Sequence, residues 1–246
     1  MSNINKKTAL VTGVSSGLGQ SLAMGLLTSG YHVYGVSRSN PNINNDLFEW
    51  VSGDLGKINS ISEILEVVGK EKIDLLINNA GVTYRNQEIN SDPKKIQEML
   101  DINLIAPILI TNHLTERLLK GLVINISSIM SVLPVRDFAL YSSSKSGLNT
   151  YFKVFALDNP DIKIFNLLPD MMNTPMLRKL LGNSFADYDK ILQVDNVTQA
   201  IIEIINKKEF ISGDSVILTN TWLKRTTENF EHHDLIYNTD IQALVA

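Results

Sequence analysis

The chain has 246 residues, of which 44% are hydrophobic, so it can bury one large core or two small ones. A net charge of −4 argues against a surface for nucleic acid, and the absence of cysteine excludes disulfides and thiolate metal sites. No apolar stretch approaches the ~20 residues of a membrane span, and residues 1–7 lack the apolar core of a secretion signal. We therefore expect a soluble, cytoplasmic protein with neither a nucleic acid nor a membrane as its partner.

Short apolar segments alternate with segments of helical periodicity along the whole chain. Seven segments are predicted to be strands, at residues 8–12, 31–37, 48–52, 73–77, 121–126, 162–168 and 215–218. Helices are predicted at about residues 17–28, 58–68, 93–119, 141–158 and 197–206. The third helix should be interrupted near Pro107, because proline lacks the N–H that a helix interior uses. Alternating strands and helices predict one α/β domain over residues 1–246, with a seven-stranded, mostly parallel, doubly wound sheet covered by helices on both faces.

A glycine-rich turn joins the first predicted strand to the first helix. Glycines permit positive φ and let backbone N–H groups approach a pyrophosphate at the positively polarised helix N-terminus. An ordinary turn between a strand and a helix is the structural alternative. The spacing Gly-x-x-x-Gly-x-Gly differs from Gly-x-Gly-x-x-Gly and indicates another branch of the Rossmann-like three-layer αβα sandwich. The cofactor-binding residues expected in this turn are Gly13, Ser15, Ser16, Gly17, Leu18 and Gly19.

Tyr141 and Lys145 lie four residues apart in a predicted helix, about one turn apart on the same face. A phenol beside an ammonium group can exchange a proton near neutral pH. Moving the tyrosine pKa from about 10 towards 7 requires roughly 4 kcal/mol, which a cation ~4–6 Å away supplies in a partly dry site. The spacing alone also fits a pair of surface residues.

The order of five motifs, from about residue 8 to residue 218, resembles the classical short-chain dehydrogenase/reductase family. The glycine turn is the first, and the pair Tyr141 and Lys145, with Ser128 thirteen residues upstream of the tyrosine, is the last. Between them come Asp54-Leu55, Asn78-Asn79-Ala80-Gly81 and Asn103. The resemblance implies hydride transfer between a nicotinamide cofactor and the carbonyl or alcohol of a small molecule, by a homodimer or homotetramer.

The resemblance also implies a role for each residue. Tyr141 would be the general acid or base, Ser128 would hydrogen-bond the reacting oxygen, and Ser127 is the weaker candidate for that role. Lys145 would lower the pKa of Tyr141 and bind the nicotinamide ribose, while Asn103 would hold a water of a proton relay. Either Asn103 or Asp54 could instead be purely structural, as a polar residue satisfied by backbone or as a turn former. The remaining residues expected to bind cofactor are Asp54, Leu55, Asn79, Ala80, Gly81, Pro169 and Thr174, together with Tyr141 and Lys145.

Cofactor choice is predicted from the end of the second strand. An acidic residue there normally accepts a hydrogen bond from the ribose 2′-hydroxyl, and this chain has Ser37-Arg38 instead. Arg38 can bind a 2′-phosphate, which predicts a preference for NADP(H). The alternatives are that Arg38 only stacks on adenine and that the enzyme uses NAD(H).

The chain departs from the family at two places. Asp170 follows Pro169 where the family has glycine, so we expect a positive φ at Asp170 and a carboxylate beside the nicotinamide. Residues of about 220–246 form a tail that has no clear counterpart, and we expect it to pack across the cleft or onto a neighbouring subunit. His232 and His233 in this tail fit solvated chain better than a metal site, so no metal is expected.

A lid over the substrate is expected at about residues 171–193, which mix apolar residues, Phe185 among them, with Arg178 and Lys179. Arg85 and Arg136 are loop cations near the expected mouth of the site, and they predict an anionic or strongly polar carbonyl substrate. Two other functions stay open: an NAD-dependent alcohol dehydrogenase of the same fold, and a non-catalytic dinucleotide-binding sensor or scaffold.

Overall fold

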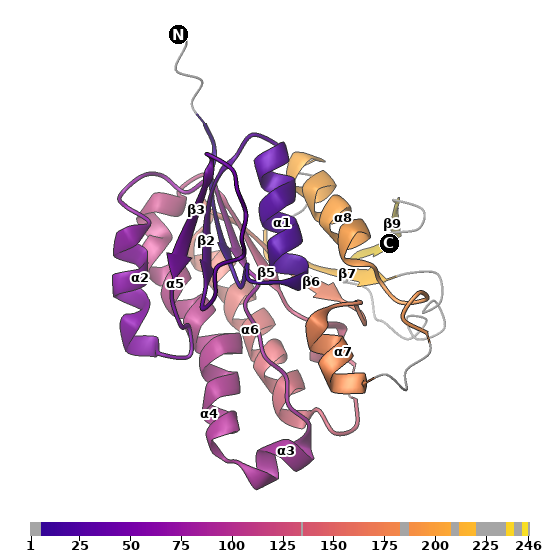
Figure 1. Ribbon diagram of the computed structural model, residues 1–246. Helices are drawn as coiled ribbons and strands as arrows, with labels where there is room; N and C mark the ends of the chain where they lie inside the picture. Colours follow the sequence, from indigo (N-terminus) through magenta and orange to yellow (C-terminus); the bar gives the residue numbers. More distant parts are fainter. Residues whose placement is uncertain are drawn as a thin grey trace.

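The computed structural model describes residues 6–133, 135–182, 187–207 and 212–219, together with the backbone of two strands at 235–238 and 243–245. One sheet runs through these residues, with helices on both of its faces (Figure 1). The seven strands predicted from the sequence are all present: β1 (Thr8–Thr12), β2 (His32–Ser37), β3 (Phe48–Ser52), β4 (Leu75–Asn78), β5 (Leu122–Ile126), β6 (Lys163–Pro169) and β7 (Ser215–Thr219).

The sheet is larger than predicted, because the tail contributes β8 (Leu235–Asn238) and β9 (Ala243–Val245). Over the described residues the strand order is β3-β2-β1-β4-β5-β6-β7-β8-β9. Every neighbouring pair is parallel except β8 and β9, which are antiparallel. The expectation of a mostly parallel, doubly wound sheet is confirmed, and the tail adds two strands to it.

Helices cover the sheet in two layers, which completes the predicted αβα sandwich. The α-helices are α1 (Gly17–Thr28), α2 (Ile61–Val67), α3 (Asn86–Ser91), α4 (Lys94–Leu100), α5 (Ala106–Leu114), α6 (Ala139–Asp158), α7 (Pro175–Leu181) and α8 (Val194–Lys207). α1 and α8 cover one face, while α2, α5 and α6 cover the other (Figure 1). Strand residues alternate between the two cores, as the period of two requires: Leu10 and Leu76 pack under α2 and α5, whereas Val11 and Ile77 pack under α1.

The predicted interruption near Pro107 is a π-helical turn, Asp101–Ile105, between α4 and α5. In this turn the N–H of Ala106 donates to the carbonyl of Asp101, five residues back. Pro107 has no N–H, so it cannot donate to the carbonyl of Asn103, four residues back. The π-helical turn that interrupts the helix therefore includes Asn103. The short helix α3 was missed because its six residues carry no clear periodicity.

The strand order reverses beside β1, since β2 and β3 lie on one side of it and β4 to β7 on the other. At such a reversal the loops after the two central strands separate and leave a crevice beyond the carboxyl ends of the strands, where ligands bind in folds of this kind. The glycine turn follows β1 and Asn79 follows β4, so both lie at this place. No helix in the described part of the chain combines the length and the apolar character needed to cross a bilayer.

Candidate active site

The glycine turn has the backbone that the sequence predicts. Gly13 and Gly17 have φ of 76° and 60°, in the left-handed region that favours glycine. Ser16 is the N-cap of α1, and its side chain makes no hydrogen bond to the helix. The first N–H groups of α1 are therefore not capped by this serine, which suits an anion at the helix N-terminus.

Gly19 is required by close packing. A Cβ at this position would lie 2.2 Å from the carbonyl oxygen of Gly13 and 2.4 Å from Nδ2 of Asn79. That same Nδ2 donates to the carbonyl of Thr12 at 2.9 Å. The turn after β1 and the segment after β4 are thus held together, and Asn79 contributes through its contacts with the turn.

Thr12 is a positioning residue that the sequence reasoning missed. Its Oγ1 accepts hydrogen bonds from the backbone N–H groups of both Asn79 and Ala80, at 3.0 Å each. The threonine immediately before the first glycine of the turn is a signal that could have shown this. Its hydroxyl sets the distance between the two segments on either side of the crevice.

At the far side of the crevice, the Ser37 hydroxyl already has two partners. It donates to the carbonyl of Ser39 at 2.8 Å and accepts from Nε1 of Trp50 at 3.1 Å. Arg38 is exposed beside it. Asp54 accepts from the N–H of Gly56 at 3.1 Å, as its structural alternative predicted, and Leu55 is buried. Because Ser37 stands where an acidic residue is common, its side chain brings no negative charge to this end of the site.

Tyr141 and Lys145 both lie near the start of α6, on one face. Nζ of Lys145 is 6.0 Å from the centre of the Tyr141 ring and donates to the carbonyl of Ile126 at 2.8 Å. Burial lowers the pKa of Lys145 to about 8. Burial raises the pKa of Tyr141, while a hydrogen bond with Ser128 acts in the lowering direction. Desolvation is the larger of these two effects on Tyr141, and the lowering by Lys145 that the resemblance implies is not among them.

Ser128 and Ser127 have different surroundings. Ser128 interacts with the Tyr141 side chain, and its Oγ accepts from the N–H of Met130 at 3.1 Å. Ser127 is directed to the backbone of α6, where its Oγ donates to the carbonyl of Lys145 at 3.4 Å. Ser128, the serine that the thirteen-residue spacing indicated, is therefore the one that interacts with Tyr141.

Asn103 is buried and bound to backbone on the far side of the lysine. Its Oδ1 accepts from the N–H of Val82 and its Nδ2 donates to the carbonyl of Val82, both at 2.8 Å; Nδ2 also donates to Ser144 at 3.2 Å. A Cβ at Gly81 would lie 3.3 Å from Oδ1 of Asn103 and 3.6 Å from Nζ of Lys145. Gly81 thus separates the two side chains, and its lack of a side chain lets the group stay compact.

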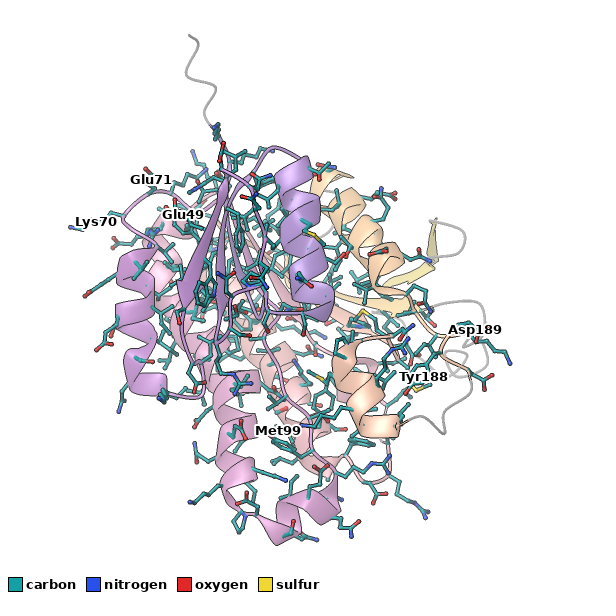
Figure 2. The ribbon with its side chains drawn as sticks, viewed as in Figure 1. Glu49, Lys70, Glu71, Met99, Tyr188 and Asp189 are labelled. Carbon is teal, nitrogen blue, oxygen red and sulfur yellow. The ribbon has the colours of Figure 1, made fainter. Side chains whose placement is uncertain are left out.

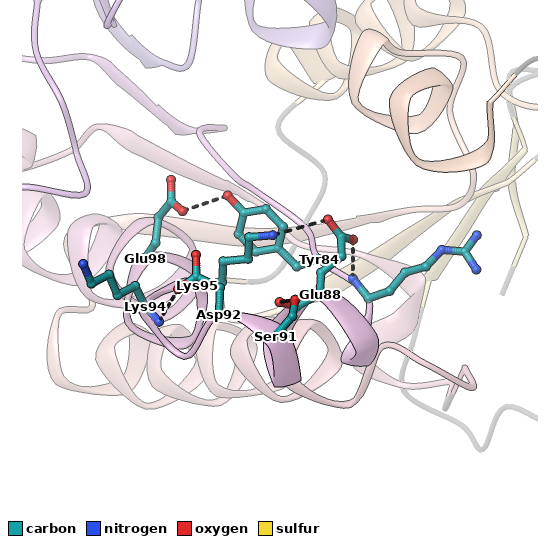
Figure 3. Close-up of polar contacts among 8 residues, drawn as sticks. Tyr84, Glu88, Ser91, Asp92, Lys94, Lys95 and Glu98 are labelled. Atoms are coloured by element: carbon teal, nitrogen blue, oxygen red, sulfur yellow. Dashed lines mark hydrogen bonds and ion pairs between the residues drawn. The ribbon is translucent and has the colours of Figure 1, made fainter.

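The loop after Gly81 is fixed to α4 by a polar cluster that the sequence did not predict. Tyr84 donates to Glu98 at 2.7 Å, and Lys95 lies 5.0 Å from the Tyr84 ring and 3.7 Å from Glu88 (Figure 3). Burial, with the carboxylate of Glu98, raises the pKa of Tyr84 to about 12. This tyrosine therefore stays protonated as a hydrogen-bond donor and holds the loop against the helix that precedes Asn103.

The lid begins against the glycine turn. Thr174 caps α7 by accepting from the N–H of Leu177 at 3.2 Å, and Pro175 approaches to 3.4 Å from the position of a Cβ on Gly17. Tyr188 of the lid and Glu49 of β3 lie on opposite sides of the molecule (Figure 2). The lid therefore lies on the other side of the molecule from the edge strand β3. Phe185 and residues 183–186 lie outside the described part of the chain.

Two of the cations predicted to bind an anionic substrate, Arg85 and Arg178, have partners within the protein. Arg85 lies 5.8 Å from the Phe138 ring, and its Nη2 is 3.5 Å from the carbonyl of Leu180 in α7. Arg178 donates to Asn173 at 2.8 Å. Arg136 is exposed. Arg85 is thus better described as a contact between the loop and the lid.

Asp170 does not need the backbone freedom of the glycine it replaces. The described residues other than glycine that have positive φ are Asn42, Lys120 and Asp137, so the expectation of a positive φ at Asp170 is wrong. Its N–H donates to the carbonyl of Leu218 at 3.0 Å, which continues the ladder between β6 and β7 and keeps the backbone extended.

Metal binding finds no support in the described part of the chain, where no group of three or more histidine, aspartate or glutamate side chains could hold an ion. His232 and His233 lie outside the described residues.

Comparison with known proteins gives consistent matches. The model of the family described as short chain dehydrogenase matches residues 7–183. A 3-oxoacyl-[acyl-carrier-protein] reductase from Buchnera aphidicola (subspecies Schizaphis graminum) is 30% identical over 234 residues, which cover 87% of this chain and 96% of the relative.

Solved structures share the fold. A 3-ketoacyl-(acyl-carrier-protein) reductase from Brucella melitensis, solved with NADH, has a TM-score of 0.74 at 23% identity and covers 86% of this chain and 96% of its own. An NAD(P)-dependent protein from Beutenbergia cavernae, solved with NADP at low occupancy, has a TM-score of 0.77 at 20% identity, with coverages of 86% and 94%. At these identities the structures support the fold, and the two proteins were solved with different nicotinamide cofactors.

Proposed function

The chain belongs to the short-chain dehydrogenase family and is an NAD(P)-dependent oxidoreductase, and we propose that it reduces a small polar ketone or aldehyde with NADPH. The observation that carries this proposal is the arrangement of Ser128, Tyr141 and Lys145 at one end of the crevice, with Asn103 behind the lysine. These four side chains are the groups that proton transfer to a carbonyl oxygen needs in this family.

The residues around the crevice suit a dinucleotide. The N–H groups of the glycine turn and of α1 would bind the pyrophosphate, Asp54 and Leu55 would lie at the adenine, and Pro169 and Thr174 would lie at the carboxamide. We expect Ser15, Ser16 and Ala80 to line the same crevice, because they belong to the loops that follow β1 and β4. When bound, the nicotinamide supplies the hydride.

Each catalytic side chain has a distinct role in the proposed reduction. Tyr141 gives its proton to the carbonyl oxygen, and Ser128 donates a hydrogen bond to the same oxygen. The raised pKa of Tyr141 keeps it protonated at neutral pH, which favours the acid role over the base role. Lys145, with a pKa of about 8, is mostly charged at pH 7 and stabilises the phenolate that remains.

Preference for NADP(H) is supported by Ser37 and Arg38, because the missing carboxylate removes repulsion of a 2′-phosphate and the exposed guanidinium can bind it. We expect Ser37→Asp to lower the ratio of kcat/KM for NADPH to that for NADH at least about tenfold, as one repulsive charge contact costs more than ~1.4 kcal/mol. Asn45→Asp adds the same charge in the exposed loop before β3 and should leave the ratio unchanged. An unchanged ratio in Ser37→Asp would contradict the preference.

The test of the function is oxidation of NADPH and of NADH against ketones, aldehydes, sugar phosphates and acyl thioesters. The proposal expects turnover of a polar carbonyl compound, faster with NADPH. Faster oxidation of alcohols with NAD would favour the NAD-dependent alternative. Cofactor binding without turnover of any compound would favour the non-catalytic sensor or scaffold.

The proposal includes a homo-oligomer that acts in the cytoplasm. Val154 and Leu157 on the outer face of α6 are 53% and 80% exposed, which suits a subunit contact along this helix. Light scattering on the purified protein measures the assembly, and a monomer at micromolar concentration would contradict it.

A further inference from the structure

Asp170 holds a buried carboxylate at the carboxyl end of β6. Asp170 directly follows Pro169, the last residue of β6, and 9% of its surface is exposed. Oδ1 accepts from the N–H of Met171. Oδ2 is buried and has no hydrogen-bond partner among the described residues. Half of this carboxylate is therefore unsatisfied in the protein.

No charged side chain of the described residues compensates the carboxylate of Asp170. None of the ion pairs of the described residues includes it. Burial raises the pKa of its carboxyl, the N–H of Met171 acts in the opposite direction, and no charged side chain in the described part of the chain contributes to the shift. A buried carboxyl oxygen without a partner is destabilising, and folded proteins rarely keep one unless a ligand or water satisfies it.

The side chain of Asp170 lies on the face of β6 that carries the catalytic helix. Residues of a strand alternate between faces, so Asn166, Leu168 and Asp170 share one face. Asn166 donates to the carbonyl of Asn149 in α6 at 3.4 Å, and Leu168 packs with Ile129, the residue after Ser128. The N–H of Asp170 continues the ladder to β7, so the alternation extends to it. The carboxylate of Asp170 is thus on the face of the sheet that α6, the helix of Tyr141, covers.

We propose that Oδ2 of Asp170 accepts a hydrogen bond from a hydroxyl group that the substrate carries next to its reacting carbonyl. The inference rests on the proposed function and narrows its substrate class to neutral hydroxyketones and hydroxyaldehydes. A carboxylate beside Asp170 would place two like charges together, and no charged side chain of the described residues contributes to the pKa shift of Asp170. A glycine in this place would leave the hydroxyl without a partner, so Asp170 sets specificity.

The test compares two ketones that differ by one hydroxyl group, 1-hydroxy-2-butanone and 2-butanone, with 2-oxobutanoate as the anionic member of the set. Wild-type protein should reduce the hydroxyketone with the highest kcat/KM. Asp170→Ala should lose about 10- to 100-fold on the hydroxyketone, the range for a hydrogen bond to a charged group, and stay within about twofold on 2-butanone. Asp170→Asn keeps the shape and should lose at least about threefold on the hydroxyketone alone.

Two controls separate this role from a structural one. Asp161→Asn removes an exposed carboxylate just before the amino end of β6, away from the site, and its ratio of the two ketones should equal that of the wild type. The Kd for NADPH, measured by fluorescence, should stay the same in Asp170→Ala and Asp170→Asn. Both variants should unfold at or above the wild-type temperature, because they remove a buried unsatisfied charge.

Several results would overturn the inference. An equal loss on both ketones, a loss confined to NADPH affinity, or a wild-type preference for 2-butanone or 2-oxobutanoate would each show that Asp170 does not read a substrate hydroxyl. None of these results would contradict the proposed reductase activity. Failure of the wild type to reduce any carbonyl compound with either cofactor would instead remove the proposed function and this inference with it.

Discussion

Burial acts in opposite directions on the pKa values of Tyr141 and Lys145. It disfavours the charged form of each, so the tyrosine pKa rises and the lysine pKa falls to about 8. In the protein without ligands, the side chain of Tyr141 is therefore a neutral phenol. The ammonium group of Lys145 beside it loses its proton more easily than that of an exposed lysine. Phenolate formation during proton transfer then relies on the positive charge of Lys145, which is mostly protonated at pH 7.

Tyr141→Phe should abolish most turnover while the fold and cofactor affinity stay unchanged. The phenyl ring keeps the packing, but the proton donor is lost, and a positioned general acid contributes about 10²- to 10⁴-fold. We expect kcat to fall by that factor, with the Kd for NADPH and the unfolding temperature within error of the wild type. A residual rate above about a tenth of the wild type would show that another group protonates the substrate.

Lys145→Met should stabilise the protein at pH 7 while it abolishes activity. Below pH 8 the lysine is protonated in both states, so the folded protein carries the full cost of the buried charge. Between pH 8 and the ordinary pKa of 10.5 only the unfolded chain keeps the proton, and this cost declines as the pH rises. Loss of the bond to the Ile126 carbonyl offsets part of the gain.

Urea unfolding of the wild type and of Lys145→Met measures this difference. We expect the variant to exceed the wild type by about 1–3 kcal/mol at pH 7 and by less at pH 9.5. A variant that is less stable at pH 7, or an advantage that grows with pH, would contradict burial as the cause of the lysine shift.

At the scale of elements, three buried asparagines align the central strands. Nδ2 of Asn78 donates to Asn125 at 2.8 Å, and Nδ2 of Asn125 donates to Asn166 at 3.0 Å. The three occupy paired positions on β4, β5 and β6. A slip of register would leave these amides unpaired, so the row fixes the register of β4, β5 and β6. The register in turn sets the relative positions of Asn79, Ser128 and Pro169 at the carboxyl ends of these strands.

The glycine turn depends on contact between backbone segments, which Gly19→Ala tests. The added Cβ would lie 2.2 Å from the Gly13 carbonyl, so the turn has to move away from its predicted ligand. We expect a loss of about 1–3 kcal/mol in the free energy of unfolding and a Kd for NADPH at least about tenfold weaker.

Gly147→Ala in α6 is the matched control, since its Cβ would meet only Leu104 carbons at 3.4 Å and 3.6 Å. Helix propensity favours alanine by up to about 1 kcal/mol, so this variant should be as stable as the wild type or more so, with unchanged affinity. Equal effects of the two substitutions would contradict the packing argument.

At the scale of the whole molecule, the tail lengthens the sheet. The sequence predicted that it packs across the cleft or onto a neighbouring subunit, whereas the structure pairs β8 with β7 in parallel, from Val216↔Leu235 to Thr219↔Asn238. β7 is thus an internal strand, and all five of its residues are buried. We infer that residues of the tail belong to the same domain as the rest of the sheet.

Deletion of residues 220–246 should expose the edge of β7. An unpaired strand edge associates with other chains, so we expect a lower unfolding temperature together with new dimers or aggregates in light scattering. Ile236→Pro removes one backbone donor from β8 and should shift both measurements in the same direction, with Ile236→Val as its control. Unchanged stability and assembly in the deleted chain would contradict the pairing of β8 with β7.

The sequence alone determined the seven strands and the doubly wound, mostly parallel architecture, and it named the candidate site residues other than Thr12. Those features rest on local patterns: apolar segments of fixed length, glycines where the turn needs positive φ, and the spacing of Ser128, Tyr141 and Lys145. It also located the helix break near Pro107, because a missing N–H is a property of one residue.

Only the tertiary structure decided the direction of the Tyr141 pKa, the two partners of the Ser37 hydroxyl, the engagement of Arg85 and the free oxygen of Asp170. Each depends on which distant segments surround a side chain and how far they exclude water. Desolvation and hydrogen bonding of a side chain depend on all the groups around it in space. These groups cannot be read from the position of the residue in the sequence.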